Sequence, residues 1–503
     1  MATQLAEKTE STDVRRYDLF IDGKFVPAAS GKTFTSTNPA NGEVVCEVAE
    51  GDKVDVDKAV KAARACFEGA WSATPVGERG RLLLRVAKGI QDRMQELANL
   101  ETLDMGGPLM WTMGTAMQAA EVFEYWAGMA TKIQGEVNPS LLPGESLNYV
   151  LREPLGVVGG ITPWNGPLIM AAWKAAPAIA CGNAVVLKPA ELTPMSTLEL
   201  ARIFADAGAP EGLFNVVPGF GPTAGAALAS HPDVDKIAFT GETVTGQDVA
   251  RNATGNLKTV TLELGGKSPH IIFDDVDLDK AVSNAAFGIY TNTGQVCTSG
   301  SRIFVHERIY DAFIEKFVAK SKSIRVGDPF DPMTHIGPLV SPEQLDRVKR
   351  YVKIGQEEGA KLLCGGKQPD DPALARGCYF LPTVFADVKN KMKVAQEEIF
   401  GPVACVMKFS GEDEVLELAN DIVYGLAAGI QTNDLKRAHR LARRLRAGSV
   451  WINTYHRIES SAPFGGYKMS GYGRENGTAM VGYLTRTKSV AVDLNDFTMD
   501  LFV

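Results

Sequence analysis

The stretch that decides the fold begins with LGVVGGITP at residues 155–163 and continues through NAVVLKPA at 183–190, LFNVVPG at 213–219, KIAFTGE at 236–242 and TVTLELGG at 259–266. Each of these segments is a short apolar run with a Gly or Pro turn, and helical stretches lie between them. Apolar, β-rich runs of this length are typical of parallel strands covered on both faces. The stretch therefore predicts a doubly wound α/β domain.

A second series of strands and helices follows LELGGKSPHIIF at residues 262–273. Its members are SRIFVHERIYDAFIEKFV (301–318), PTVF (382–385), VACVMKF (403–409), AAGIQT (427–432) and SVWINT (449–454). Strands again alternate with helical patterns, so we expect a second α/β domain.

The N-terminal part has a different pattern. After a polar tail of about 16 residues, segment 17–39 alternates apolar and polar residues around Gly and Pro, which predicts a hairpin of short strands. In segment 53–131 apolar residues recur at helical spacing, for example at Val56, Ala59, Val60 and Ala63. We expect a helical block there.

Composition limits the possible functions. A chain of 503 residues exceeds what one hydrophobic core usually supports, so at least two domains are expected. Its 45% hydrophobic and 22% charged residues are those of an ordinary globular protein. The formal net charge of -8, without a local Lys/Arg cluster, argues against a nucleic-acid partner.

The seven cysteines are scattered, with no CxxC pair and no His at metal-ligand spacing. This distribution favours a reducing compartment and predicts neither a disulfide framework nor a metal site. The first 16 residues contain no apolar signal segment, and no run approaches the roughly 18 apolar residues of a membrane span. We therefore expect a cytoplasmic protein without a membrane partner.

Among the cysteines, Cys297 has a distinctive neighbourhood, NTGQVCTSGSR at 292–302, which is small, polar and rich in Gly. A thiol in such a loop, after the helical segment 279–290, is accessible to substrate, and its pKa falls near a helix N-terminus or a cation. A small buried thiol is the alternative interpretation.

Glu263 lies between two leucines in TLELGGKSP, at the end of a predicted strand. Partial desolvation there would raise its pKa and suit the carboxylate to proton transfer. A Glu at a strand end that faces water would fit the pattern equally well.

At this point the residues match a known family. TLELGGKSP (261–269) and GQVCTSGSR (294–302) closely resemble the two active-site signatures of the aldehyde dehydrogenase superfamily. Five further blocks follow the family's order, namely ITPWNGP (161–167), NAVVLKPAELTP (183–194), VPGFGPTAGAALASHPDVDKIAFTGE (217–242), QEEIFGPV (396–403) and PFGGYKMSGYGRE (463–475). The resemblance runs from about residue 17 to the C-terminus.

The resemblance implies catalytic roles for three residues. Cys297 is the thiol that adds to an aldehyde carbonyl, and the thiohemiacetal loses a hydride to nicotinamide and becomes a thioester. Glu263 activates the hydrolytic water and helps to deprotonate the thiol. The Asn165 amide and the Cys297 backbone N–H form an oxyanion hole, a device worth roughly 3 kcal/mol in other enzymes. As part of an Asn-Gly pair, Asn165 is also an ordinary turn residue.

The expected cofactor is NAD. GETVTG at 241–246 follows the strand KIAF and places a glycine turn at a helix start, where N–H groups and the helix dipole favour a pyrophosphate. This turn is similar to the family's GxTxxG pattern. Lys188 and Glu191 match the pair that contacts the adenosine ribose, and a carboxylate there disfavours a 2′-phosphate, so NAD is expected over NADP. Without the resemblance, both are ordinary strand-end charges.

Near the nicotinamide, the resemblance implies that Glu398 and Phe400 hold the ribose and flank the ring, and that Trp164 forms a wall of the crevice. Trp164 is also a plausible core aromatic. The implied cofactor-binding set is Ile161, Thr162, Pro163, Trp164, Lys188, Ala190, Glu191, Gly221, Gly225, Phe239, Thr240, Gly241, Glu242, Thr245, Leu264, Gly265, Gln344, Glu398 and Phe400.

One residue departs from the family pattern. Where the family usually has Ser or Thr after the first glycine of the turn, this chain has Glu242, an anion beside the expected pyrophosphate. We expect its side chain to turn toward solvent or a nearby cation, which would leave NAD binding weakened but not lost.

The resemblance also places a substrate tunnel. Gly166, Thr291 and Ile458 replace bulky, mostly aromatic residues of the family, which predicts a wide, apolar tunnel for a branched, terpenoid or aromatic aldehyde. Its remaining walls are Met170, Trp173, Val296, Thr298 and Phe464. His456 and Arg457 match the same region as its only polar groups, to orient a substrate or to line the mouth, although a solvated loop pair fits them as well.

The chain order of the blocks predicts an aldehyde dehydrogenase-like α/β fold. It has a Rossmann-like cofactor domain (1–131 and 153–265), an α/β catalytic domain (266–465) and a small β oligomerisation element (132–152 and 466–503). The segments 133–154 and 485–496 match the family's oligomerisation strands, so we expect a homodimer or a dimer of dimers.

Three alternatives compete with hydrolytic aldehyde oxidation. A CoA-acylating relative would generally lack the general base, and a non-catalytic protein on the same fold would be expected to lose Cys297, Glu263 or Asn165. All three residues are present. A thiol esterase remains conceivable as a side activity through the same acyl-enzyme. Release of NADH from aldehyde and NAD, and its dependence on CoA, separates these possibilities.

Overall fold

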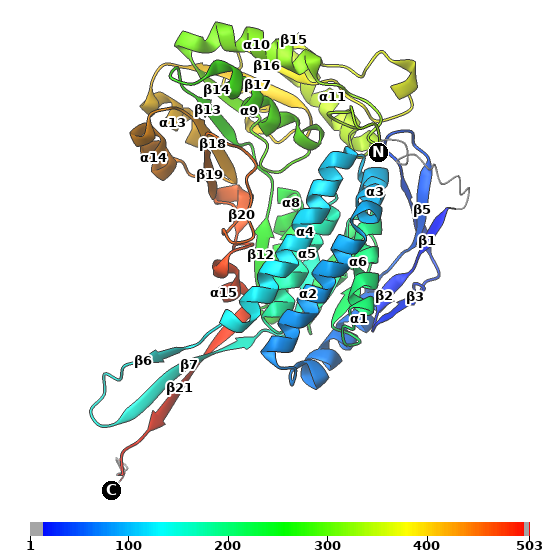
Figure 1. Ribbon diagram of the computed structural model, residues 1–503, viewed down its shortest axis with the longest axis vertical. Helices are drawn as coiled ribbons and strands as arrows, with labels where there is room; N and C mark the ends of the chain where they lie inside the picture. The colour runs from blue at the N-terminus through cyan, green and yellow to red at the C-terminus, as the bar shows by residue number, and fades with distance from the viewer. Residues whose placement is uncertain (1–13, 497–501, 503) are drawn as a thin grey trace.

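The computed structural model describes residues 14–496 and 502 (Figure 1). Two mixed α/β units carry one large sheet each, and a slender β arm projects away from both. The first 13 residues, which include most of the predicted polar tail, lie outside the described residues. No helix among the described residues is long and apolar enough to cross a membrane.

In the described residues the first sheet has eight strands, in the order β20-β12-β11-β8-β9-β10-β2-β3. Its central strands β12, β11, β8, β9 and β10 are parallel, as the apolar runs predicted. The bounds are β2 Leu19–Ile21, β3 Lys24–Val26, β8 Val157–Ile161, β9 Ala184–Lys188, β10 Phe214–Val216, β11 Lys236–Thr240, β12 Thr259–Glu263 and β20 Gly471–Tyr472. After β8, the next strands β9 and β10 are added on one side of β8, whereas the later strands β11 and β12 are added on its other side. The strand order therefore reverses between β8 and β11.

Helices cover this sheet. The predicted helical block 53–131 forms α1 Lys53–Cys66, α2 Val76–Asp92, α3 Met94–Met105 and α4 Leu109–Met129, and the remaining helices are α5 Pro167–Ala180, α6 Met195–Asp206, α7 Ala226–Ser230 and α8 Thr243–Asn252. Helices α2, α4 and α6 pack against α5, while α1 and α8 pack against α7. Local signals set their ends: Asp52 caps α1 in a capping box, and Gly106 ends α3 in the left-handed conformation.

The second sheet follows the order β15-β16-β17-β14-β13-β18-β19 and is parallel except for the edge strand β15. Its strands are β13 Pro269–Ile272, β14 Arg302–His306, β15 Lys361–Cys364, β16 Thr383–Ala386, β17 Val403–Phe409, β18 Ala427–Gln431 and β19 Ser449–Ile452. The accompanying helices are α9 Leu278–Tyr290, α10 Tyr310–Ser323, α11 Pro342–Glu357, α12 Lys393–Gln396, α13 Glu412–Asn420 and α14 Leu435–Arg444. The prediction of a second α/β unit is confirmed.

Two small sheets complete the fold. The N-terminal region is more than a hairpin, because β2 and β3 join the first sheet while β1 Arg15–Tyr17, β4 Thr33–Thr37 and β5 Val44–Ala49 form a sheet of their own. The arm consists of β6 Glu136–Asn138, β7 Ser146–Pro154 and β21 Thr485–Asp493, joined to the body through α15 Val481–Leu484 (Figure 1). Strand β20, by contrast, lies in the first sheet beside β12, although it belongs to the segment 466–503 that we had grouped with the arm.

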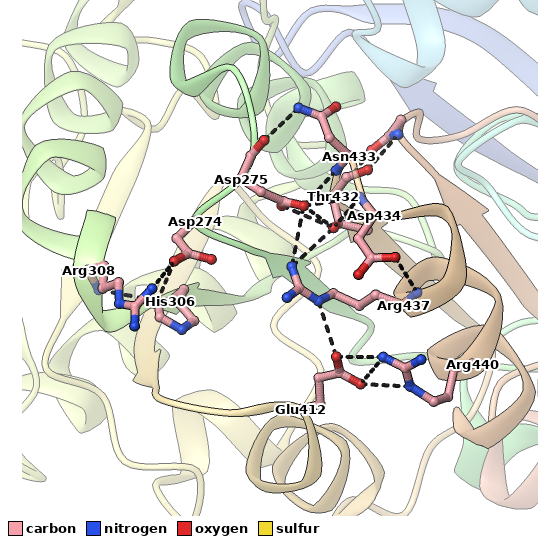
Figure 2. Close-up of polar contacts among 11 residues, drawn as sticks. Asp274, Asp275, His306, Arg308, Glu412, Thr432, Asn433, Asp434, Arg437 and Arg440 are labelled. Atoms are coloured by element: carbon pink, nitrogen blue, oxygen red, sulfur yellow. Dashed lines mark hydrogen bonds and ion pairs between the residues drawn. The ribbon is translucent and has the colours of Figure 1, made fainter.

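At the carboxyl edge of the second sheet, polar side chains are paired with one another (Figure 2). Asp275, just after β13, accepts hydrogen bonds from the Thr432 hydroxyl at 2.8 Å and from the backbone N–H groups of Asn433 and Asp434. It also forms an ion pair with Arg437 of α14 at 3.3 Å. These contacts tie the end of β13 to the turn between β18 and α14.

Candidate active site

A cavity of about 330 Å³ lies where the carboxyl ends of the first sheet face the amino ends of the second. Residues 163–166 follow β8 and residues 240–242 follow β11, so the cavity opens at the reversal of strand order. Ligands of doubly wound sheets bind in the crevice at such a switch point. From the second unit, the segments before β14, β17 and β18 complete the wall.

Cys297 lies on this wall, in a loop with a strained backbone. Asn292 and Thr293, five and four residues before it, have φ of 48° and 58°, in the left-handed region that residues other than glycine rarely adopt. The Thr293 hydroxyl donates to the Gly337 carbonyl at 3.0 Å, and the Gln295 side-chain oxygen accepts from the Val340 N–H at 2.9 Å. These bonds hold the loop in place and direct the partly exposed thiol to the cavity.

The electrostatic environment of the thiol differs from the expected one. Burial raises the pKa of Cys297 to about 12, and the carboxylates of Glu398 and Glu263 act in the same direction. The backbone N–H groups of Cys297 and Thr298 oppose these effects. The pKa is therefore not lowered by a helix N-terminus or a cation, and the thiol needs a nearby base to take its proton.

Glu263, the last residue of β12, also lines the cavity and is 3% exposed. Burial raises the pKa of its carboxyl well above the usual value, and the Glu475 carboxylate raises it further. Neither side-chain oxygen has a hydrogen-bond partner within the described part of the chain. The expectation of a desolvated carboxyl is correct, because the segment around Gly465 packs over it: a β-carbon there would come within 2.6 Å of the Glu263 Oε1.

A buried ion pair lies beside Glu263. Lys174 of α5 and Glu475 are both almost completely buried, and Lys174 Nζ donates to the Glu475 carboxylate and, at 2.8 Å, to the Thr240 hydroxyl. Lys174 lowers the pKa of Glu263, against the effects of burial and Glu475. Glu475 lines the cavity, although our reasoning from the sequence did not select it.

Asn165 lies on the cavity wall just before α5. Its side-chain amide donates to the Gln295 carbonyl at 2.9 Å, and its backbone carbonyl accepts from the Asn292 amide at 3.3 Å. The residue thus joins the first unit to the Cys297 loop, and its NH₂ group lies at the end of the cavity where the thiol is found.

The residues matched to the nicotinamide end surround the same cavity. Trp164 and Phe400 meet edge to face, with ring centroids 5.1 Å apart. The Gln344 amide donates to the Phe400 carbonyl at 2.7 Å and supports a backbone with φ of 61°. The Glu398 carboxylate accepts from the Gly266 N–H at 2.9 Å, and burial raises its pKa to about 7.

The residues matched to the adenosine end lie outside this cavity, near the carboxyl ends of β9 and β11. Lys188 is buried and pairs with the half-exposed Glu191 at 3.2 Å, and a β-carbon on Gly225 would lie 3.6 Å from the Lys188 side chain. The Phe239 ring lies against Gly241, where a β-carbon would come within 2.6 Å of it. Of the residues that the resemblance implies for cofactor binding, those that do not line the cavity are Ile161, Thr162, Lys188, Ala190, Glu191, Gly221, Gly225, Phe239 and Thr245.

Glu242 does turn toward a cation. Its carboxylate lies 3.3 Å from the Arg347 guanidinium of α11, and it does not cap the helix α8 that it precedes. Both residues line the cavity. Our sequence reasoning did not identify Arg347, because residues 105 positions apart in the chain have no local signal of contact.

The end of the cavity assigned to the substrate is mostly apolar. Gly166, Met170, Trp173, Val296, Thr298, Ile458 and Phe464 all line it, together with Trp111, Ile169, Phe287 and Leu426, which we had not selected. Trp173 and Phe464 are in ring contact at 5.2 Å.

Two expectations about this end were wrong, namely that Thr291 lines the cavity and that His456 and Arg457 are its only polar groups. For His456 and Arg457 themselves, each of the two interpretations left open holds for one residue. Thr291 does not line the cavity, because its hydroxyl donates to the Phe287 carbonyl one turn earlier, and the Phe287 ring forms the wall instead. His456 lines the cavity and Arg457 does not, since the Arg457 side chain pairs with Glu459 at 2.9 Å. Nor are these two the only polar groups, because Thr115 and Gln118 also lie on the wall.

Comparison with known proteins identifies the family. The model of the aldehyde dehydrogenase family matches residues 25–490, and the chain belongs to this family. It is 49% identical over 488 residues, 96% of this chain and 90% of the other, to the protein from Arabidopsis thaliana named aldehyde dehydrogenase family 2 member B4, mitochondrial. It is 48% identical over 485 residues, again 96% and 90%, to the mitochondrial benzaldehyde dehydrogenase of Antirrhinum majus.

A solved structure agrees with these relatives. The NAD⁺ complex of an aldehyde dehydrogenase from Bacillus cereus has a TM-score of 0.93 and 45% identity, covering 96% of this chain and 97% of that one. The predictions of the fold, of an NAD-dependent aldehyde dehydrogenase and of NAD as the cofactor are confirmed.

The expectation of a cytoplasmic protein is contradicted by the same comparisons, since both curated relatives are mitochondrial by name. The reasoning failed because a missing apolar segment argues only against a secretory signal. Mitochondrial targeting segments are amphipathic and need no apolar run.

Proposed function

We propose that the chain oxidises a bulky, apolar aldehyde to the carboxylic acid with Cys297 as nucleophile and Glu263 as general base. The observation that carries this proposal is one cavity that holds a thiol and an unpartnered, desolvated carboxyl together with the Asn165 amide. Aldehyde oxidation itself is the activity of the family.

The residues divide the chemistry between them. Because burial raises the pKa of Cys297, the thiol needs a base, and the ionised carboxylate of Glu263, which lines the same cavity, takes the thiol proton as sulfur adds to the carbonyl. The Asn165 amide stabilises the resulting oxyanion. Glu263 then passes this proton to solvent. After the thiohemiacetal has become a thioester, the Glu263 carboxylate removes a proton from the attacking water, the Cys297 thiolate is expelled and takes that proton back, and the acid leaves.

NAD fits the nucleotide end of the cavity. The first N–H groups of α8 are not capped by a side chain and are free for a pyrophosphate, and Glu191 is placed to accept from a ribose hydroxyl. Trp164, Gln344, Glu398 and Phe400 would hold the nicotinamide half. When bound, NAD supplies the acceptor for the hydride.

The shape of the substrate end supports a bulky substrate. At Gly166 a β-carbon would lie 3.1 Å from the Ile169 side chain and within 4 Å of no other described residue, so the Ile169 side chain is what limits the space there. The surrounding walls are aromatic and aliphatic, which favours a branched, terpenoid or aromatic aldehyde over acetaldehyde. The name of the Antirrhinum relative, benzaldehyde dehydrogenase, is consistent with this preference.

The test is a panel of aliphatic, terpenoid and aromatic aldehydes with NAD⁺, read as NADH absorbance, without CoA. We expect oxidation by the wild-type protein, with higher kcat/KM for bulky members, and none by Cys297→Ala. That variant should still bind NAD⁺, as fluorescence quenching would report. Oxidation by Cys297→Ala would show that the nucleophile is wrong.

The arm supports a homo-oligomer, which we also propose. The strands β7 and β21 pair over nine residues, while Val137, Leu141 and Leu142 at its tip are 75%, 97% and 78% exposed. An apolar surface beside an open strand edge favours pairing with another chain, here a second copy of the same protein.

A further inference from the structure

The contact between Glu242 and Arg347 crosses the cavity from one α/β unit to the other. Glu242 is the N-cap residue of α8, and the helix has ten residues. An N-cap carboxylate ordinarily accepts from the first N–H groups of its own helix. Here it does not, and among the described residues its partner is the Arg347 guanidinium at 3.3 Å.

Arg347 is anchored on the opposite side. Its second terminal nitrogen donates to the Glu398 backbone carbonyl at 2.8 Å, and the guanidinium lies 5.6 Å from the centre of the Tyr351 ring. Its Nε is buried and has no hydrogen-bond partner within the described residues. The guanidinium is therefore a fixed cation on the wall that faces the start of α8.

We propose that Arg347 is an affinity-determining residue of the dinucleotide site, because it holds the Glu242 carboxylate away from the phosphate-binding end of α8. The inference rests on the NAD site of the proposed function and deepens it. Without Arg347, the carboxylate can rotate onto the first N–H groups of α8, where it competes with the pyrophosphate for the same donors and repels it.

The pairing with Arg347 allows the glycine turn before α8 to carry an anion where the family usually has Ser or Thr. The charge of Glu242 is neutralised by a residue that lies 105 positions later in the chain. If Arg347 acts by holding Glu242, its effect on NAD⁺ affinity depends on the residue at position 242. If Arg347 binds a phosphate directly, its effect does not depend on that residue.

A double-mutant cycle tests this difference. The dissociation constant for NAD⁺ is measured by quenching of protein fluorescence, at low ionic strength, for the full-length wild type, Arg347→Met, Glu242→Gln and the double variant. With Glu242 present, Arg347→Met should raise the dissociation constant for NAD⁺ at least about fivefold. This is the effect expected when the Glu242 carboxylate and a phosphate repel each other in contact and water screens the repulsion. With Gln at 242, the same change should have little effect. Additive effects would overturn the inference, because Arg347 would then contact the cofactor directly, and so would no effect in either background.

Two further variants serve as a substitute and as a control. Arg347→Gln repeats the cycle if the Met variant does not fold, with the same coupling expected. Arg350→Met, on the exposed side of α11, makes the same change in net charge and should leave NAD⁺ affinity unchanged. A wild-type protein that does not bind NAD⁺ would overturn the proposed cofactor site and this inference together, whereas normal wild-type binding without coupling would overturn the inference alone.

Discussion

At the residue scale, the site depends on buried groups whose charged forms are disfavoured. Burial raises the pKa of both Cys297 and Glu263, so neither is ionised easily at neutral pH. Glu263 can take the thiol proton only after it has lost its own, so the pair reacts only in the fraction of molecules in which the carboxyl is ionised.

Glu475 gives a way to move the pKa of Glu263, the proposed general base. Its carboxylate raises the pKa of Glu263, and the base acts only when deprotonated, so activity should fall as pH is lowered through a value well above 4.5. Glu475→Gln removes this repulsion, lowers the pKa of Glu263 and should shift the acidic limb of kcat against pH to lower pH.

The control is Glu121→Gln, an exposed residue of α4, which should leave that limb in place. Glu475→Gln also leaves Lys174 buried without its anion, a change that costs about 3–5 kcal/mol. Profiles should therefore be recorded below the apparent Tm of the variant. A shift to higher pH would contradict the assignment of Glu263 as base.

Gly166 tests the width of the substrate end. Gly166→Phe places a ring in the open space beside Ile169, so KM for an aromatic or branched aldehyde should rise far more than KM for propanal. Steady-state rates with both substrates measure the ratio. If both KM values rise equally, the wide tunnel is wrong.

At the element scale, the placement of the site follows from the two sheets. The first contributes the carboxyl ends of β8, β11 and β12, and the second contributes the segments that precede β14, β17 and β18. The carboxyl edge of the second sheet is closed by ion pairs instead (Figure 2).

Asp275 tests the role of this paired edge. Asp275→Ala leaves the Asn433 N–H and the Thr432 hydroxyl without this acceptor, while the Asp434 N–H keeps only the Thr432 hydroxyl, so we expect a loss of about 2 kcal/mol and an apparent Tm lower by a few degrees. Thermal unfolding measures the change. Asp274→Ala, which removes an ion pair with the exposed Arg308, should change Tm much less; equal losses would contradict the account.

The strands and helices were predictable because their signals are local. Apolar runs gave the central strands of both sheets, and helical spacing gave the block that became α1 to α4. Non-local relations were beyond reach: the sheet of β1, β4 and β5, the pairing of β20 with β12, and the contacts of Glu475 and Arg347 bring together distant parts of the chain. Thr291 was misplaced because one turn of α9 decides whether it or Phe287 faces the cavity.

At the scale of the whole molecule, the arm is the part that stands apart from the two α/β units of the same chain. It extends away from the body, with its apolar tip uncovered (Figure 1). The cavity lies between the two α/β units, and its lining residues come from outside β6, β7 and β21, so assembly and chemistry can be tested separately.

Replacing both Leu141 and Leu142 with Asp should weaken assembly, because charges would replace almost fully exposed apolar side chains at the proposed contact. Sedimentation at several protein concentrations should show a smaller particle than the wild type. As a control, Leu257→Asp, another almost fully exposed leucine away from the arm, should not change the mass. A wild-type protein that is monomeric throughout would refute the proposed oligomer.

The central claim, that Cys297 carries the acyl group and Glu263 drives its hydrolysis, is tested most directly by rapid mixing of Glu263→Gln with aldehyde and saturating NAD⁺. The amide cannot accept a proton from the thiol or from water, so we expect the burst of NADH to form more slowly than in the wild type but still to reach an amplitude comparable to the enzyme concentration. The steady rate that follows should be reduced roughly 10²-fold or more, because the thioester accumulates. The wild type should show a much faster steady phase. If the variant forms NADH at a single slow rate without a burst, the thioester does not accumulate, and the claim that Glu263 drives its hydrolysis is wrong.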